Sequence, residues 1–171
     1  YYSRKKALNS EPIIELITLI GHHTLRAIIA DVRKATHYAI MADETRDVSN
    51  KEQLAICIRW VDTEDTVHED LVGVVQAHKT DAESLTIAIK DVLTRCSFPI
   101  EACKGQAYDG AAAMMGHLNG VGVRIQQEVP AAFPIHCFAH CLQLCLKTAA
   151  SDATCIRDIL NLTSELNSFF K

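Results

Sequence analysis

Apolar and polar residues recur with two different periods along the chain, which predicts helices at both ends and a sheet between them. Apolar residues follow a helical spacing near the two termini, whereas short apolar runs typical of strands cover 38–42, 54–61 and 67–76. The N-terminal pattern predicts two helices that divide at Gly21, with Leu25, Ile28, Ile29 and Val32 facing the core. His22 and His23 lie at the predicted junction, where adjacent histidines indicate a solvated corner.

The middle of the chain alternates strands with helices after an initial run of three strands. Polar links join the first three strands, which predicts an antiparallel meander. Thr80 and Glu83 form a capping-box pair that predicts the start of a helix reaching Cys96. Further strands are expected at 101–109 and 133–138, with a mixed helical and turn segment at 111–129. Helices follow at 140–150 and 152–171, and the last should bury an apolar stripe: Ile156, Ile159, Leu160, Leu166 and Phe169.

This order of elements predicts an α/β fold with a five-stranded mixed sheet. A right-handed crossover through the helix at 80–96 places the fourth strand parallel to the first and beside it, and the fifth strand follows. The meander continues on the other side of the first strand. We therefore expect a helical lead-in over 1–36 and a sheet-containing core over 37–171.

Composition narrows the class of protein. The 171 residues are 49% hydrophobic, enough for one domain with a sizeable core. The seven cysteines are odd in number and lie in apolar segments, which favours reduced, buried thiols in the cytosol or nucleus. No apolar run approaches a membrane span in this pattern, and the N-terminus lacks the order of a signal peptide, so no membrane partner is expected.

Charge is distributed unevenly and argues against direct DNA binding by this segment. The net charge is -4; residues 1–34 carry six basic and three acidic side chains, whereas 43–91 carries five basic and twelve acidic ones. An acidic middle repels a phosphate backbone unless metal ions or another domain compensate.

Candidate chemistry lies where two predicted strands end. Asp43, Glu44 and Asp47 follow the strand 38–42, and Asp109 follows the fourth strand. If these strands are parallel neighbours, their carboxyl ends meet, and so do Asp43 and Asp109. Two adjacent carboxylates favour a hard divalent ion, Mg²⁺ or Mn²⁺ above Zn²⁺, of the kind that supports phosphodiester cleavage. The alternatives are a turn contact from Asp43 to Thr45 or Ser49, and a helix cap by Asp109.

Two other constellations carry weaker signals. Zinc ligands are suggested by His136, Cys137, His140, Cys141 and Cys145, but structural zinc sites combine two separated ligand pairs and no second pair is evident, so no structural zinc is expected. Buried thiols with His140 beside the acids are the favoured interpretation. The glycines of GHLNGVG, residues 116–122, lack the Lys-Ser/Thr of a phosphate-binding loop and indicate a turn.

At these residues the chain resembles a known family. The segments ALNSEPIIELI, IMADETRDVSNKEQLAICIRWVD, GQAYDGAAAMMG and GVGVRIQQEVPAAFPIHCFAHCLQL resemble the hAT superfamily of transposases, and more closely the domesticated transposase-like domain of zinc finger MYM-type and related vertebrate proteins. The resemblance implies a ribonuclease H-like fold with a carboxylate triad, in which Asp43 matches the first acid and Asp109 the second. Cys137 and His140 match a Cys-x-x-His motif near the active site.

The chain also departs from the family's pattern. The family's third acid is a Glu on a helix after a large helical insertion, and the late carboxylates Glu128, Asp158 and Glu165 sit in no matching motif. Cys141 replaces an Arg that relatives usually carry, which removes a fixed positive charge. We therefore expect a transposase-derived core that lacks the third acid and the insertion, and also the upstream zinc finger and C-terminal dimerisation region that the family carries elsewhere.

Three functions remain open at this point. The first is a non-catalytic domain of a nuclear DNA- or chromatin-associated protein, in which DNA contacts and self-association come from regions outside this chain. The second is an active metal-dependent nuclease or strand-transferase core whose third carboxylate lies elsewhere. The third is a protein-interaction module. Nuclear location is implied by the resemblance.

Overall fold

The computed structural model describes residues 10–169 as a mixed sheet with helices, in the order predicted from the sequence. The strands are β1 (Tyr38–Arg46), β2 (Glu52–Val61), β3 (Val67–Gln76), β4 (Cys103–Tyr108) and β5 (Phe133–His136). The helices are α1 (Ser10–Val32), α2 (Ala82–Cys96), α3 (Ala112–Met115), α4 (Val121–Glu128), α5 (Phe138–Asp152) and α6 (Thr154–Phe169), and a 3₁₀ turn, η1 (Ile100–Ala102), precedes β4.

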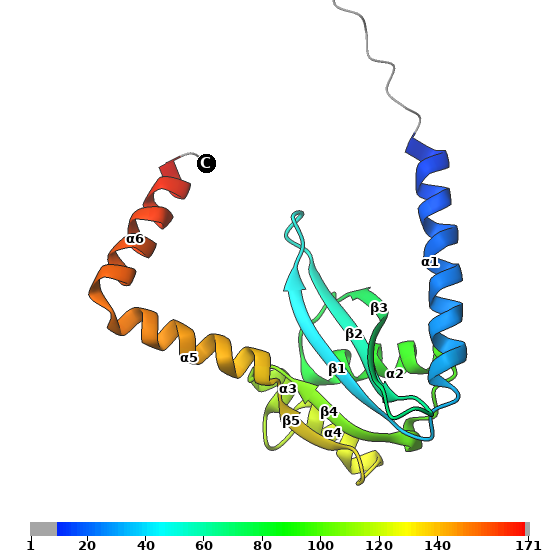
Figure 1. The fold of residues 1–171 in the computed structure, drawn as a ribbon. Coiled ribbons are helices and arrows are strands. Elements are labelled where there is room, and N and C mark those ends of the chain that lie inside the picture. The colour runs from blue at the N-terminus through cyan, green and yellow to red at the C-terminus, as the bar shows by residue number, and fades with distance from the viewer. Residues whose placement is uncertain (1–9, 170–171) are drawn as a thin grey trace, which may run out of the picture.

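The five strands form one sheet in the order β3-β2-β1-β4-β5, and Figure 1 shows it from one face. β1 to β3 are antiparallel neighbours, whereas β4 lies parallel to β1 and β5 parallel to β4. The predicted fold class, an α/β fold of ribonuclease H-like type with this mixed sheet, is therefore confirmed. The parallel pairing of β1 with β4 brings the carboxyl ends of these two strands to the same edge of the sheet.

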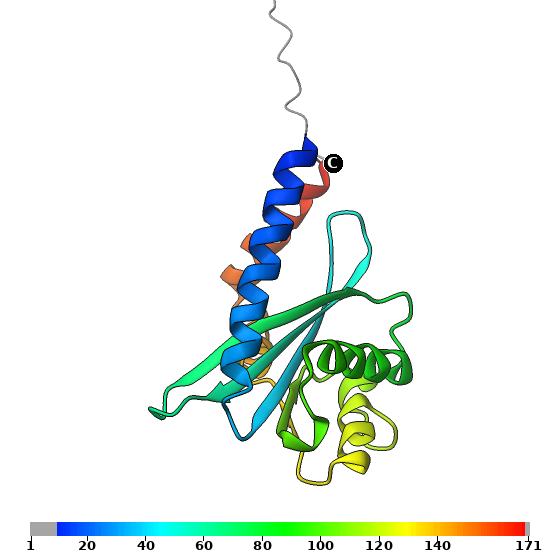
Figure 2. The same cartoon turned by 90° about the vertical axis from the view of Figure 1, so that its right-hand side faces the viewer.

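The core lies between one face of the sheet and the helices α2 and α4, which Figure 2 shows together on one side of the strands. Alternate residues of β1 and β2 point into it, and the following are almost fully buried: Ile40, Leu54, Ile56 and Ile58 from the strands, and Leu85, Ile89 and Ile125 from the helices. A bulge in the β2–β3 pairing brings Gly73 under α2, where a Cβ atom would lie 3.0 Å from Val92 Cγ1. The glycine permits this close approach.

α1 is one continuous helix, so the predicted division at Gly21 was wrong. Gly21 lies on an exposed part of the helix with open space around its Cα, and an isolated glycine there lowers helix stability without breaking the helix. His22 and His23 are accordingly exposed on a helix and not at a corner. The second half of α1 packs as predicted, with Val32 buried against the core.

By length and composition, Glu11–Val32 is apolar enough to cross a membrane, contrary to the expectation that no apolar run approached that length. The last two turns of this helix pack on the sheet, and Arg33, the next residue, donates to the carbonyl of Cys96 at the end of α2 (3.1 Å). These contacts dock the last turns of α1 on the domain, whereas the apolar side chains from Ile13 to Ile20 are exposed.

The two C-terminal helices differ most from the prediction. α5 leaves the sheet after β5 and α6 continues beyond it, so that both extend away from the sheet (Figure 1). The predicted buried stripe of α6 is exposed, and so are Leu142 and Leu146 of α5. Cysteines divide in the same way: Cys96 and Cys103 are buried, whereas Cys145 and Cys155 on these helices are exposed, so the prediction of uniformly buried thiols was wrong.

Candidate metal site

The parallel register of β1 and β4 brings Asp43 and Asp109 to the same place. Paired residues run from Ala39 and Gly105 to Met41 and Ala107, and two further steps along each strand align the two aspartates. Because side chains alternate between the faces of a sheet, both aspartates lie on the face of Met41 and Ala107. A cavity of about 320 Å³ on this face is lined by both carboxylates.

β1 itself continues beyond Asp43 to Arg46, paired with β2 alone, so the first aspartate lies within the strand and not at its end as predicted. What ends near Asp43 is the parallel pairing with β4. Loss of that neighbour opens the sheet at this point and leaves the Asp43 side chain exposed. The predicted position of the carboxylate therefore holds with respect to β4, for a different local reason.

Asp109 and Asp47 both organise turns. The Oδ1 atom of Asp109 accepts a hydrogen bond from the backbone N–H of Ala111 (3.1 Å), but the cap residue of α3 is Ala111, without a side-chain cap. The helix-cap alternative for Asp109 is thus replaced by a turn contact that fixes its carboxylate at the strand end. Asp47 accepts from the backbone N–H groups of Ser49 and Lys51 and closes the β1–β2 hairpin.

The Cys-Phe-Ala-His segment lies beside the two aspartates. The backbone N–H of Cys137 donates to the carbonyl of Tyr108 (2.7 Å), which ties the start of α5 to the end of β4. Cys137 and His140 then line the cavity that Asp43 and Asp109 line. The structure therefore brings together the four residues that the resemblance singled out.

Glu44 is a further acid next to this site that sequence reasoning named only as a neighbour of Asp43. Its Oε1 atom is buried and has no hydrogen-bond partner among the described residues. Burial raises the pKa of this carboxyl, and the charges of Glu52, Asp109 and Asp43 raise it further. Strand alternation is the signal that could have found it, because Glu44 follows Ile40 and Ala42 on the buried face of β1.

The ligand set suits a hard ion that keeps most of its own water. Within residues 10–169, no three His, Cys, Asp or Glu side chains converge so as to hold a metal ion, and the acids lining the cavity are Asp43 and Asp109. Mg²⁺ is commonly held by one or two carboxylates together with waters and substrate phosphates. Two carboxylates beside an imidazole fit that pattern, with the remaining ligands supplied by solvent or by a phosphate.

None of the late carboxylates considered as a third acid reaches the cavity. Glu128, at the end of α4, pairs with Lys90 of α2, and Asp158 lies 4.0 Å from its neighbour Arg157. Glu165 is exposed on α6, the helix most remote from the sheet in Figure 1. As far as the chain is described, the site thus has two acids of a possible three.

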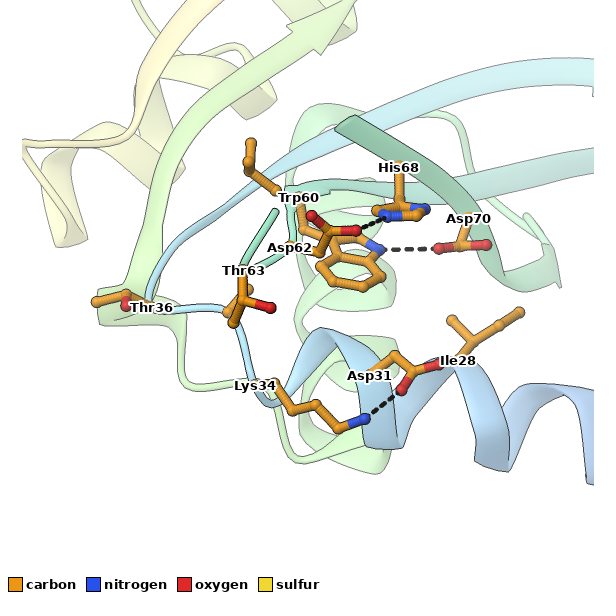
Figure 3. A pocket seen from close by; sticks show the side chains of 11 residues that line it. Ile28, Asp31, Lys34, Thr36, Trp60, Asp62, Thr63, His68 and Asp70 are labelled. Carbon is orange, nitrogen blue, oxygen red and sulfur yellow. Dashed lines mark hydrogen bonds and ion pairs between the residues drawn. The ribbon is translucent and has the colours of Figure 1, made fainter. Parts of the chain in front are cut away.

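A second cavity, of about 550 Å³, lies between the end of α1 and the β2–β3 hairpin (Figure 3). The Nε1–H of Trp60 donates to Asp70 (2.8 Å), while His68 stacks on the indole and pairs with Asp62 (2.7 Å). The hydrogen bond with His68 lowers the pKa of Asp62, and backbone hydrogen bonds from the hairpin turn lower it further. These polar groups bond to one another, so the cavity is a structural junction between helix and hairpin.

Comparison with known proteins gives the family of the chain. The family described as ZMYM1/FAM200, RNase-like domain matches residues 3–120. The 52 kDa repressor of the inhibitor of the protein kinase of Homo sapiens is 27% identical over 128 residues, which is 74% of this chain and 16% of the relative. The Mus musculus protein of the same name is 28% identical over 114 residues, which is 66% of this chain and 14% of the relative.

The chain therefore spans about a sixth or less of the length of these relatives. The family match covers α1, the whole antiparallel meander, α2 and β4, and it includes both Asp43 and Asp109. Together with the mixed sheet, this match shows that the chain belongs to the ZMYM1/FAM200 RNase-like domain family.

Proposed function

We propose that this chain is a transposase-derived ribonuclease H-like domain that keeps two acids of an ancestral metal site and does not cut DNA by itself. The observation that carries the proposal is the pairing of Asp43 and Asp109 on one cavity whose lining includes no third acid. Two-metal phosphodiester cleavage needs carboxylates that clamp both the attacking and the leaving oxygen. Two acids can hold one ion loosely but give an incomplete clamp.

The proposed setting is a nuclear DNA- or chromatin-associated protein. Its support is the name of the relatives, which describes a repressor, and the transposase-like ancestry implied by the resemblance. The acidic stretch from Asp43 to Asp91 would repel DNA, so DNA contacts are assigned to other parts of such a protein. Mg²⁺ or Mn²⁺ is the proposed ion, bound by Asp43 and Asp109 with His140 beside them.

Thermal unfolding with and without Mn²⁺ tests the metal part of this proposal. An ion that binds the folded state raises Tm, and both Asp43→Asn and Asp109→Asn should remove the rise, because each removes one of two charged ligands. Asp65→Asn is the matched control: Asp65 sits in the β2–β3 turn with φ 61°, a conformation that Asn tolerates. An unchanged Mn²⁺ effect in both site variants would refute the metal site.

A second candidate, an active metal-dependent nuclease core, is favoured by the same two aspartates if a longer chain supplies the third carboxylate. Plasmid cleavage in Mn²⁺ separates the candidates. We expect no cleavage by the 171-residue protein. Cleavage that Asp43→Asn abolishes and Asp65→Asn preserves would establish the nuclease instead.

A further inference from the structure

A further cavity lies beside the two aspartates, on the face of the sheet away from α2 and α4. Figure 2 shows these two helices on the opposite side of the strands. The cavity has a volume of about 620 Å³ and lies over β1, β4 and β5. It shares Met41, Ala107 and Cys137 with the cavity of Asp43 and Asp109, so the two cavities adjoin along this face.

The strand register gives this cavity a flat floor between two larger side chains. One row across the sheet pairs Arg59 of β2, Ala39 of β1, Gly105 of β4 and Phe133 of β5. Neighbouring strands lie about 4.8 Å apart, so the Cα atoms of Arg59 and Phe133 are about 14 Å apart. Between them stand the methyl group of Ala39 and the hydrogen of Gly105, and a Cβ atom on Gly105 would lie 3.3 Å from that of Ala39. The floor is therefore closely packed and free of large side chains.

Phe133 presents an aromatic ring at one edge of this floor. Its side chain is 67% exposed, and within residues 10–169 no other ring contacts it. Phe138, which lines the same cavity, is 80% exposed. An exposed aromatic face beside an open floor can accept a second flat ring by stacking.

The charged side chains that line this cavity leave a positive excess. Arg59 and Lys104 line it, and Glu69 is the one acid among the described residues that do so. Arg59 pairs with Glu69, so the charge of Lys104 is left over. A negatively charged ligand is therefore attracted here, in contrast to the acidic stretch of the chain.

We infer that this floor is a stacking platform for an unpaired base of single-stranded nucleic acid. Proteins bind single strands by stacking bases on aromatic side chains beside cationic groups. Ala39 and Asp43 are four residues apart on β1, a distance of about 13 Å. A strand advances at least about 3.4 Å per nucleotide, so about four nucleotides or fewer join the platform to the two aspartates. That a phosphate of the same strand is held there rests on the proposed metal site.

A single strand fits this face better than a duplex or an apolar helix. The acidic stretch from Asp43 to Asp91 repels the two charged backbones of a duplex, whose contacts stay with other parts of a longer protein. An apolar helix would bury Lys104 without a partner, which is costly. A phosphate backbone instead pairs with Lys104 while its bases cover the apolar floor.

Fluorescence anisotropy of a labelled oligothymidylate of about eight nucleotides, in Mn²⁺ and about 50 mM salt, tests the inference on the 171-residue protein. We expect binding, and Phe133→Ala and Phe133→Leu should each raise the dissociation constant about tenfold, because both remove the ring. Phe133→Trp, which keeps an aromatic face, should bind at least as tightly as the parent protein. Leu118→Ala is the matched control, since Leu118 is 71% exposed between α3 and α4 and lies outside the cavity.

Two outcomes of this experiment would overturn the inference. The first is no binding by the parent protein. The second is equal binding by the parent protein, Phe133→Leu and Phe133→Ala, which would leave the face to an apolar segment of a longer polypeptide. An abasic strand of the same length gives an independent measurement: the parent protein should bind it about tenfold more weakly than oligothymidylate, and Phe133→Ala should bind both alike. Equal binding of the two strands by the parent protein would also overturn the platform.

Repeating the titration in EDTA separates this inference from the proposed function. Binding that depends on Phe133 but is the same in EDTA and in Mn²⁺ would refute the metal site and support the platform. Binding that Mn²⁺ strengthens but that does not depend on Phe133 would support the metal site and overturn the platform.

Discussion

Gln106 shows how one polar side chain organises the centre of this fold. It is only 1% exposed, and its Nε2 group donates to the carbonyls of Gly122 (3.2 Å) and Ala132 (2.8 Å). Its Oε1 accepts from the hydroxyl of Tyr108 (2.8 Å), whose pKa burial raises far above its usual range. These hydrogen bonds connect β4 to the start of α4 and to the chain entering β5. Tyr108, the last residue of β4, directly precedes Asp109 of the cavity.

Gln106→Leu should lower the free energy of unfolding by about 3 kcal/mol, because it leaves two buried carbonyls and a buried hydroxyl without the hydrogen bonds that Gln106 makes. Urea denaturation measures the change. Gln127→Leu, on the exposed side of α4, should stay within about 0.5 kcal/mol of the parent protein. A similar loss of stability in both variants would mean that the hydrogen bonds of Gln106 contribute no more to stability than an exposed glutamine does.

Glu44 is a second residue whose environment should have a measurable effect, here on the pH dependence of stability. A carboxyl whose pKa is raised on folding binds its proton more tightly in the folded state than in the unfolded state. Stability from this group is therefore greatest below the unfolded pKa and is lost as the pH rises through the raised value.

Glu44→Gln should accordingly stabilise the protein at pH 7, by less than about 1 kcal/mol because solvent screens a partly exposed group. The advantage should disappear near pH 4, where the parent carboxyl is protonated. Melting curves at both pH values measure it, with Glu64→Gln in the exposed β2–β3 turn as the control. A loss of stability at pH 7 would show instead that ionised Glu44 has a favourable partner.

At the scale of elements, α2 shows how the ends of a helix are set. The predicted capping box began at Thr80, but the cap residue is Asp81, which accepts from the backbone N–H of Ser84 (3.0 Å) and from its hydroxyl (2.8 Å). A carboxylate is a stronger acceptor than a hydroxyl and also favours the positive end of the helix dipole. At the other end, Ser97 takes the left-handed conformation with φ 55°.

Asp81→Ala should therefore lower the denaturant concentration at the midpoint of unfolding, whereas Thr80→Ala should leave that midpoint unchanged. Both changes are made at adjacent positions on the same connection, so each serves as the control for the other in denaturant unfolding. The opposite order of effects would restore the capping box predicted from the sequence.

For the whole molecule, the sheet with α2 to α4 forms a unit that does not depend on α6. α6 packs on α5 and makes no substantial contact with the sheet or with another described helix. The cavity of Asp43 and Asp109 is complete by Gln143 in the first turns of α5. Stability and the candidate site thus belong to the sheet-containing unit.

A chain ending at Ala153 should keep both the melting temperature and the Mn²⁺ response of the full protein. The comparison is made at equal protein concentration for all chains. A chain ending at Ala132, which removes β5 and exposes the edge of β4, should lose its cooperative transition, as followed by the fluorescence of Trp60. Equal melting of all three chains would contradict this division.

The sequence pattern was sufficient for the strands, their order and the meeting of the two aspartates. Three apolar runs joined by short polar links predicted β1 to β3, and β3 was predicted at its observed bounds. The right-handed crossover rule then placed β4 beside β1. These features follow from local periodicity and chain chirality, which a sequence carries in full. The metal-binding role of Asp43 and Asp109 stays a prediction.

Only the tertiary structure decided which apolar stripes are covered and which polar groups are enclosed. Gly21 does not divide α1, because no neighbouring element packs there to favour a bend, and the stripe of α6 is exposed because α6 extends away from the sheet. Glu44 has one buried carboxyl oxygen because the end of β1 remains on the core face after its pairing with β4 has stopped. The spacing of apolar residues predicts that one face of a helix or strand is apolar. Which partner covers that face depends on contacts between residues far apart in the chain.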